Sequence, residues 1–173
     1  MWAKTFRLKN RTRIAFAAAL ALLAAGWVFY AAKSSTTETP SELDYFKGTW
    51  AVTMKSNPRQ PFRWTVKDDL RGGWVAGVVE QNGERISTDF WRQSAGKIER
   101  FAFTGGGLFV RIESQGWEAG RMVMSGVASD KTGETKIRET ITKENERRFH
   151  ALWERQEADG RWVVFSDETC TKQ

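Results

Sequence analysis

The sequence predicts an all-β fold, an antiparallel up-and-down β-barrel of about ten strands, preceded by one N-terminal helix that is a transmembrane segment or a signal sequence. Three observations predict it. Residues 14–32 form one apolar run without a charged side chain. The chain after Tyr45 consists of short or alternating apolar runs separated by turn residues, which is typical of all-β proteins. The connections between these runs are too short to cross over to a parallel partner.

The N-terminal segment predicts the location of the protein. Residues 1–13 carry five Lys or Arg and no acid. A helix over residues 14–32 would reach close to the ~30 Å thickness of a hydrocarbon core. The positive-inside rule then keeps residues 1–13 in the cytoplasm. We therefore expect a single-pass protein of the inner membrane with its C-terminal domain in the periplasm.

Cleavage of this segment is the alternative. The uncharged core is longer than the ~7–15 residues of a typical signal peptide. Trp27, Phe29 and Tyr30 at its exit end are typical of a retained anchor. Against retention, 32–34 (Ala-Lys-Ser) offers small residues at a cleavage site, which would release the domain into the periplasm. Residues 33–44 are polar and Pro-broken, so they predict a linker, and residues 45–173 form the barrel domain.

Ten strands are predicted in order, with no further helix. Asn82-Gly83 and Asp159-Gly160 are the clearest hairpin turns between them, because both pairs favour positive φ. Closure into a barrel is favoured because it leaves no unpaired edge, and a two-sheet sandwich is the alternative. The predicted strands are 49–56, 61–67, 73–81, 84–93, 97–104, 107–114, 117–128, 134–143, 147–157 and 161–167.

Alternation within four of these strands predicts which side chains point inward, since successive strand residues face opposite sides. The predicted inward sets are Trp50, Val52 and Met54; Phe62, Trp64 and Val66; Trp74, Ala76 and Val78; and Phe149, Ala151 and Trp153.

The net charge and the cysteine content limit which partners and which covalent links the protein can have. The net charge of +6 is concentrated in residues 1–40, which hold six of the 27 basic and one of the 21 acidic residues. Residues 41–173 are left with 21 basic and 20 acidic side chains, so the basic surface expected of a nucleic-acid binder is missing. Cys170 is the only cysteine, which excludes an intramolecular disulfide, and we assign it no role.

Short motifs support the barrel prediction. Gly48-Thr49-Trp50 opens the first strand and resembles the Gly-x-Trp entry of lipocalins and fatty-acid-binding proteins, in which the Trp closes one barrel end. With 89–91 (Asp-Phe-Trp) and 159–162 (Asp-Gly-Arg-Trp), residues 46–172 resemble small bacterial lipocalin-like domains of unknown function. The resemblance implies a lipocalin-like fold and does not specify a ligand.

Candidate ligand-binding residues are aromatic and basic. Aromatic walls with a few polar groups are typical of ligand cavities, although the same side chains can simply fill a small barrel. The resemblance to fatty-acid-binding barrels implies that an interior Arg could hold a ligand carboxylate; Arg121 and Arg138 alternate with apolar neighbours and could face inward or outward. The predicted ligand-binding residues are Trp64, Trp74, Trp91, Arg121, Arg138 and Trp153.

The sequence predicts no metal site, no cofactor and no catalytic residue. Nitrobindins, a related class of barrels, hold haem through one late-strand His, but the alternation places His150 opposite Phe149, Ala151 and Trp153, hence outward. As a general base His150 has no nucleophile that the sequence places beside it. We therefore expect a protein that is not an enzyme.

Three hypotheses follow for the function. The first is a membrane-tethered, non-catalytic binding module for a small apolar or amphipathic ligand. The second is an envelope protein–protein interaction domain with a packed barrel, and the third is a barrel enzyme that uses His150. A cavity of about 300 Å³ or more would favour the binding module.

Overall fold

The barrel pattern can be followed in a computed structural model that describes residues 41–70 and 73–173. The predicted cytoplasmic segment, the predicted membrane-spanning or signal helix at 14–32 and residues 33–40 of the linker lie outside these residues. Within the described ranges, no helix has the length and apolarity needed to cross a membrane.

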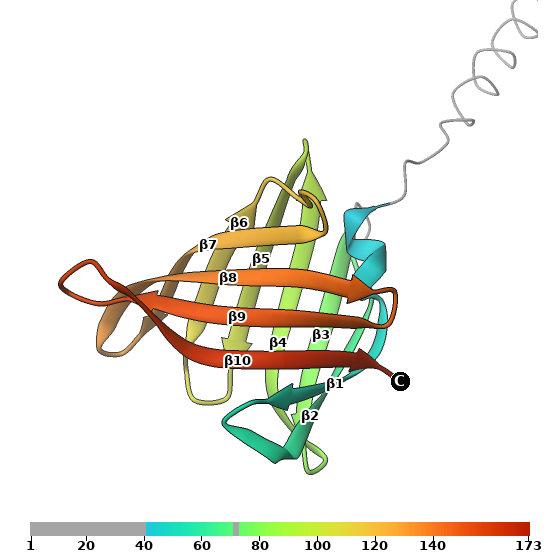
Figure 1. Cartoon of the computed structure of the whole chain (residues 1–173), viewed down its shortest axis with the longest axis horizontal. Coiled ribbons are helices and arrows are strands. Elements are labelled where there is room, and N and C mark those ends of the chain that lie inside the picture. Colours follow the sequence, from blue (N-terminus) through green and yellow to red (C-terminus); the bar gives the residue numbers. More distant parts are fainter. Residues whose placement is uncertain (1–40, 71–72) are drawn as a thin grey trace, which may run out of the picture. The chain divides into compact units, whose positions relative to one another are not determined.

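Ten antiparallel strands form the domain, as predicted. Each strand pairs with its neighbours in sequence, and the first strand also pairs with the last, so the sheet closes into a barrel (Figure 1). The closure excludes the two-sheet sandwich. The strands are β1 (Gly48–Met54), β2 (Asn57–Asp68), β3 (Trp74–Gln81), β4 (Glu84–Ser94), β5 (Lys97–Thr104), β6 (Phe109–Ser114), β7 (Arg121–Asp130), β8 (Gly133–Asn145), β9 (Arg148–Gln156) and β10 (Trp162–Lys172).

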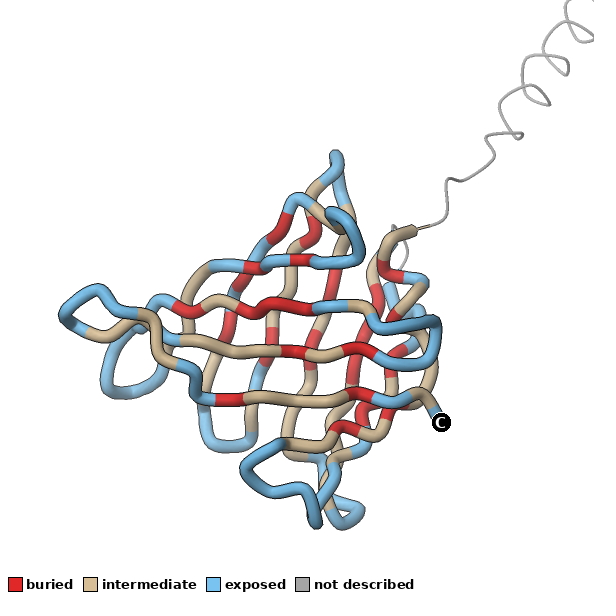
Figure 2. Tube along the Cα trace, in the orientation of Figure 1, coloured by how far each residue is buried: buried red, intermediate tan, exposed pale blue. Residues whose placement is uncertain are grey.

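Burial alternates along the strands, whereas the hairpins are exposed (Figure 2). The predicted inward sets are confirmed for β1, β2 and β9, whose inner residues belong to the core, pack against it or, as Met54 does, line the barrel interior. Asn82 and Gly83, both at positive φ, form the predicted hairpin turn between β3 and β4.

The prediction for β3 is wrong: Val75 and Val79 face inward, and Trp74 lies on the outer face. Both faces of β3 are apolar, so alternation alone cannot choose between them. The register decides, because cross-strand partners share a face. Val79 lies opposite the inward Trp64, and Val75 lies opposite the inward Trp91.

A short 3-10 helix, η1 (Glu42–Phe46), covers one end of the barrel, where the sequence predicted only a linker up to residue 44. Ser41 begins the helix with a capping box that includes Asp44. Leu43 and Phe46, one turn apart, are fully buried in the core. Helix η1 therefore acts as the apolar plug of this end.

Polar contacts hold η1 on the strand ends. The Glu42 backbone N–H donates to Gln93 Oε1 of β4 (2.9 Å), and the Trp117 backbone N–H donates to Glu42 Oε2 (2.9 Å). Trp50 Nε1 donates to the Phe46 carbonyl oxygen (2.6 Å), so the Trp of the Gly-x-Trp motif closes this end, as the resemblance implied.

Candidate functional site

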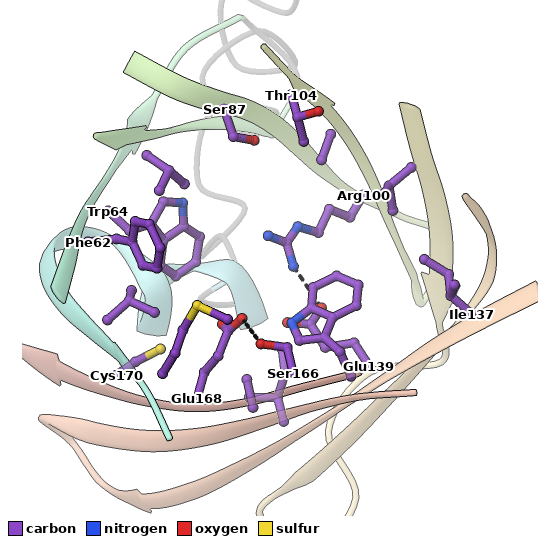
Figure 3. Close-up of a pocket in the computed structure, with 18 of the residues that line it drawn as sticks. Phe62, Trp64, Ser87, Arg100, Thr104, Ile137, Glu139, Ser166, Glu168 and Cys170 are labelled. Carbon is purple, nitrogen blue, oxygen red and sulfur yellow. Dashed lines mark hydrogen bonds and ion pairs between the residues drawn. The ribbon is translucent and has the colours of Figure 1, made fainter. Parts of the chain in front are cut away.

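A cavity of about 360 Å³ lies inside the barrel (Figure 3). All ten strands and η1 contribute side chains to it. At the end of the barrel that η1 covers, the cavity is lined by the aromatic side chains of Phe46, Trp64 and Phe149, which pack against one another. Towards the opposite end the lining includes Ile86, Ser87, Thr104 and Leu108, next to the hairpins that follow β3 and β5, and the exposed Phe165.

The cavity wall is mostly apolar, with a small set of polar side chains. Such a surface suits a ligand with an apolar body and one or two polar groups. The polar and ionisable side chains that line it are Ser87, Arg100, Thr104, Glu139, Ser166, Glu168 and Cys170.

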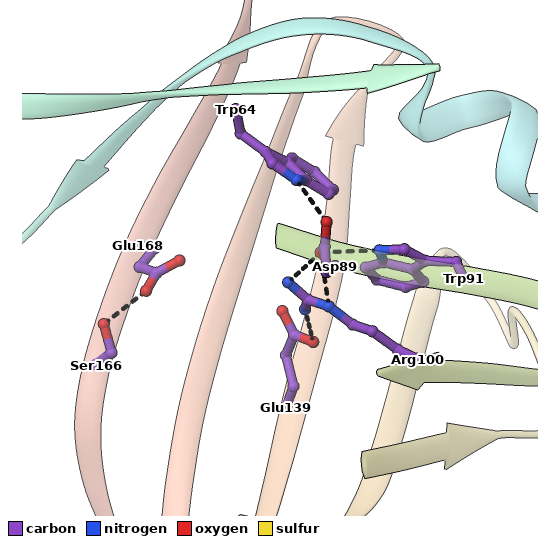
Figure 4. A network of polar contacts seen from close by, with 7 residues as sticks. All are labelled: Trp64, Asp89, Trp91, Arg100, Glu139, Ser166 and Glu168. Atoms are coloured by element: carbon purple, nitrogen blue, oxygen red, sulfur yellow. Dashed lines mark hydrogen bonds and ion pairs between the residues drawn. The ribbon is translucent and has the colours of Figure 1, made fainter. Parts of the chain in front are cut away.

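A buried ionic network forms part of the wall of this cavity, through Arg100 and Glu139 (Figure 4). Arg100 of β5 donates from Nε to Asp89 Oδ2 (3.0 Å), and its Nη2 lies 2.8 Å from the same oxygen. Its Nη1 donates to Glu139 Oε2 of β8 (2.7 Å). The Asp89 and Glu139 side chains are 1% and 4% exposed. One guanidinium thus links two carboxylates of strands β4 and β8 across the barrel.

Indole groups complete the network. Trp64 Nε1 donates to Asp89 Oδ1 (3.2 Å), and Trp91 Nε1 donates to Asp89 Oδ2 (2.9 Å). The Arg100 guanidinium lies over the Trp91 and Trp153 rings, 4.4 and 5.2 Å from their centroids. These contacts satisfy the Asp89 carboxylate and hold the Arg100 side chain rigidly within the aromatic wall.

Gly77 of β3 makes room for the Asp89 carboxylate. A Cβ at this position would lie 1.9 Å from Asp89 Oδ1 and 2.4 Å from Trp64 Nε1. Gly77 pairs with Asp89 across the β3–β4 ladder, so the absence of a side chain lets the carboxylate lie back against the sheet.

Burial raises the pKa values of two glutamates that line the cavity, Glu139 and Glu168. Burial raises the pKa of Glu139 to about 7, although Arg100 beside it opposes the rise. Burial also raises the pKa of Glu168 on β10, and its hydrogen bond from Ser166 opposes that rise. Protonation of these two groups is therefore easier inside the barrel than in water.

The raised pKa of Glu139 predicts a pH-dependent stability. An acid with a raised pKa in the folded state stabilises the protein below its unfolded pKa of about 4.3, and this contribution is lost as pH rises through the folded value. We expect the free energy of unfolding of the wild type to fall by on the order of 1–3 kcal/mol from pH 5 to pH 8, relative to Glu139→Gln. Urea denaturation at both pH values measures it.

The matched control is Glu113→Gln on the outer face of β6, which should follow the pH dependence of the wild type. Parallel pH profiles of the wild type and Glu139→Gln would show that the Glu139 carboxyl does not titrate in this range.

Cys170 belongs to the cavity wall rather than to a free chain end. Its side chain is buried on β10, where it pairs with β1 and β9. Burial raises the pKa of the Cys170 thiol well above its usual range, with nearby Glu168 acting in the same direction. The thiol is therefore a packing group of low reactivity.

The structure brings together three of the predicted ligand-binding residues. Trp64, Trp91 and Trp153 line the cavity. Trp74 lies outside against Phe101 and under the Arg92 guanidinium.

The two predicted arginines lie elsewhere. Arg138 bonds Glu154 and lies over the Trp162 ring, and Arg121 is exposed at the start of β7. Among the residues that the structure describes, the arginine that lines the cavity is Arg100, which was not among the predicted binding residues. The available signal was its spacing of two residues from Ile98 and Ala102, both of which are buried.

His150 does not face the cavity. The His150 Nε2 atom lies 2.6 Å from Asp167 Oδ1. His150 is next to Ala151 and Asp167 is next to Glu168, and both of these neighbours face inward, so His150 and Asp167 face outward. Among residues 41–70 and 73–173, no group of His, Cys, Asp or Glu side chains is arranged to hold a metal ion.

Comparison with known proteins adds no family to this description: no protein-family model matches the chain, and no curated protein sequence matches it significantly.

Proposed function

We propose that the domain is a lipocalin-like, non-catalytic binding module that takes up a small amphipathic molecule in its barrel. The observation that carries the proposal is the cavity of about 360 Å³, which lies within the range of about 300–1,000 Å³ of small-molecule sites. The two alternatives have less support. A protein–protein interaction domain would be favoured by a packed barrel, but this barrel contains a cavity. An enzyme using His150 would be favoured by an imidazole ring that faces the cavity, but the His150 ring contacts Asp167 instead.

We further propose that residues 14–32 keep this module at the inner membrane, with the barrel in the periplasm. The uncharged run and the five basic residues before it support this placement. A module held beside a membrane would meet amphipathic molecules as they leave the bilayer.

Titration of the full-length protein with the neutral fluorophore N-phenyl-1-naphthylamine tests for binding inside the barrel. We expect saturable binding to the wild type and its loss in Ala128→Trp, because the new indole would fill the cavity that Ala128 lines. Ala158→Trp, in an exposed turn, is the matched control and should bind as the wild type does. Equal binding by both variants would place the fluorophore outside the barrel and refute the proposal.

A further inference from the structure

One carboxylate of the cavity is only partly used by the protein. Glu168 Oε1 accepts a hydrogen bond from Ser166 Oγ (2.7 Å). Its other oxygen, Oε2, has no hydrogen-bond or ion-pair partner among the residues that the structure describes, and Glu168 stands apart from the Arg100 network (Figure 4). The side chain points into the cavity (Figure 3). It is therefore an acceptor open to a ligand.

The guanidinium, by contrast, is already engaged. The Nε–Nη2 edge of Arg100, the edge suited to clamping a carboxylate, faces Asp89, and Nη1 is bonded to Glu139. An incoming carboxylate would have to compete with both of these buried acids.

The charges of the cavity also favour a cationic ligand over an anionic one. Three carboxyl groups, those of Asp89, Glu139 and Glu168, face one guanidinium, that of Arg100. The Asp89–Arg100 pair is neutral, so ionisation of either glutamate leaves a negative excess inside the barrel. A buried negative excess attracts a cation and repels an anion.

We propose that the ligand is an amphipathic amine, whose ammonium group bonds Glu168 and whose apolar body fills the cavity. This inference rests on the proposed function and specifies its ligand. The assignment differs from the carboxylate that an interior arginine would suggest.

Binding of such a ligand should depend on pH. The groups around Glu168 are Arg100 on β5, Glu139 on β8, Cys170 on the same strand, and Asp167 and His150 on the outer side of β10 and β9. Because burial raises the pKa of Glu168, protons compete with the ammonium group at a higher pH than they would at an exposed glutamate. Amine binding should therefore weaken as pH falls.

Displacement of N-phenyl-1-naphthylamine by n-octylamine, n-octanol and octanoate tests the inference on the full-length protein, because the three compounds share one chain and differ in the head group. At pH 8 we expect octylamine to bind about tenfold more tightly than octanol, since a charge-assisted hydrogen bond is the stronger, and octanoate to bind most weakly. Glu168→Gln should remove the preference for octylamine over octanol, whereas Glu113→Gln on the outer surface should keep the wild-type ranking.

The outcomes separate the two proposals. Failure of the wild type to bind the fluorophore in the barrel overturns the proposed function. Binding of the fluorophore with equal displacement by all three compounds, or with octanoate the tightest, overturns only the amine assignment. The wild-type ranking needs no variant, so the test stands even if Glu168→Gln does not fold.

Discussion

Replacing Arg100 with methionine is expected to lower the free energy of unfolding by about 3–5 kcal/mol, because two buried carboxylates lose their counter-ion. Asp89 would keep its two indole donors, whereas Glu139 would keep no ion-pair partner among the described residues. Methionine preserves much of the apolar stem of the side chain, so the loss reports on charge more than on packing. Urea denaturation at pH 7 measures it.

Arg111→Met, on the exposed face of the neighbouring strand β6, is the matched control and should change stability by no more than about 0.5 kcal/mol. Adding Asp89→Asn and Glu139→Gln to Arg100→Met should restore part of the lost stability, since the stranded charges are then removed. Similar losses in Arg100→Met and Arg111→Met would contradict the buried network.

Replacing Trp50 with alanine is expected to cost about 3–5 kcal/mol, the usual range for a large aromatic side chain in a core. Trp50 is completely buried, packs on Phe149 at a ring-centroid distance of 4.9 Å, and bonds the η1 backbone at Phe46. Its removal opens a void and frees the plug at the same time. Thermal and urea denaturation of the full-length protein measure the loss.

Two further variants separate the contribution of the Trp50 hydrogen bond from that of its buried ring. Trp50→Phe keeps most of the packing but leaves the Phe46 carbonyl without its donor, at an expected cost of about 1–3 kcal/mol. Trp74→Ala removes the same side chain from the outer face of β3 and should cost less than Trp50→Ala. An equal cost for Trp50→Ala and Trp74→Ala would mean that Trp50 does not anchor the plugged end.

Much of the barrel can be predicted from the sequence, because its strands are short, sequential and separated by clear turns. The inner face is predictable where only one face is apolar, as in β1, and unpredictable where both are, as in β3. There the register with Trp64 and Trp91 decides, and register is a property of the folded sheet. Helix η1 could not be predicted because five residues are too few to show a helical period, and its buried residues Leu43 and Phe46 follow a polar, Pro-containing stretch.

The polar site was harder to predict for a different reason. Charged strand residues are normally solvent-exposed, so Arg100 and Glu139 read as outer residues when each strand is considered alone. Their burial depends on three-dimensional pairing, since Arg100 on β5 meets Asp89 on β4 and Glu139 on β8. The sequence identified the aromatic wall at Trp64, Trp91 and Trp153, but not the ions that it surrounds.

The pairing of β1 with β10 also determines when the site can exist during folding. The ladder joins Trp50 to Lys172, near opposite ends of the domain sequence, whereas the hairpins between them are local. Local hairpins form quickly, and closure of a long loop is the slower event. Glu168 and Cys170 lie on the closing strand, so a nascent chain still lacking β10 has neither an enclosed cavity nor its open carboxylate. A ligand of the kind proposed could therefore be enclosed only after β10 has been synthesised and has paired with β1 and β9.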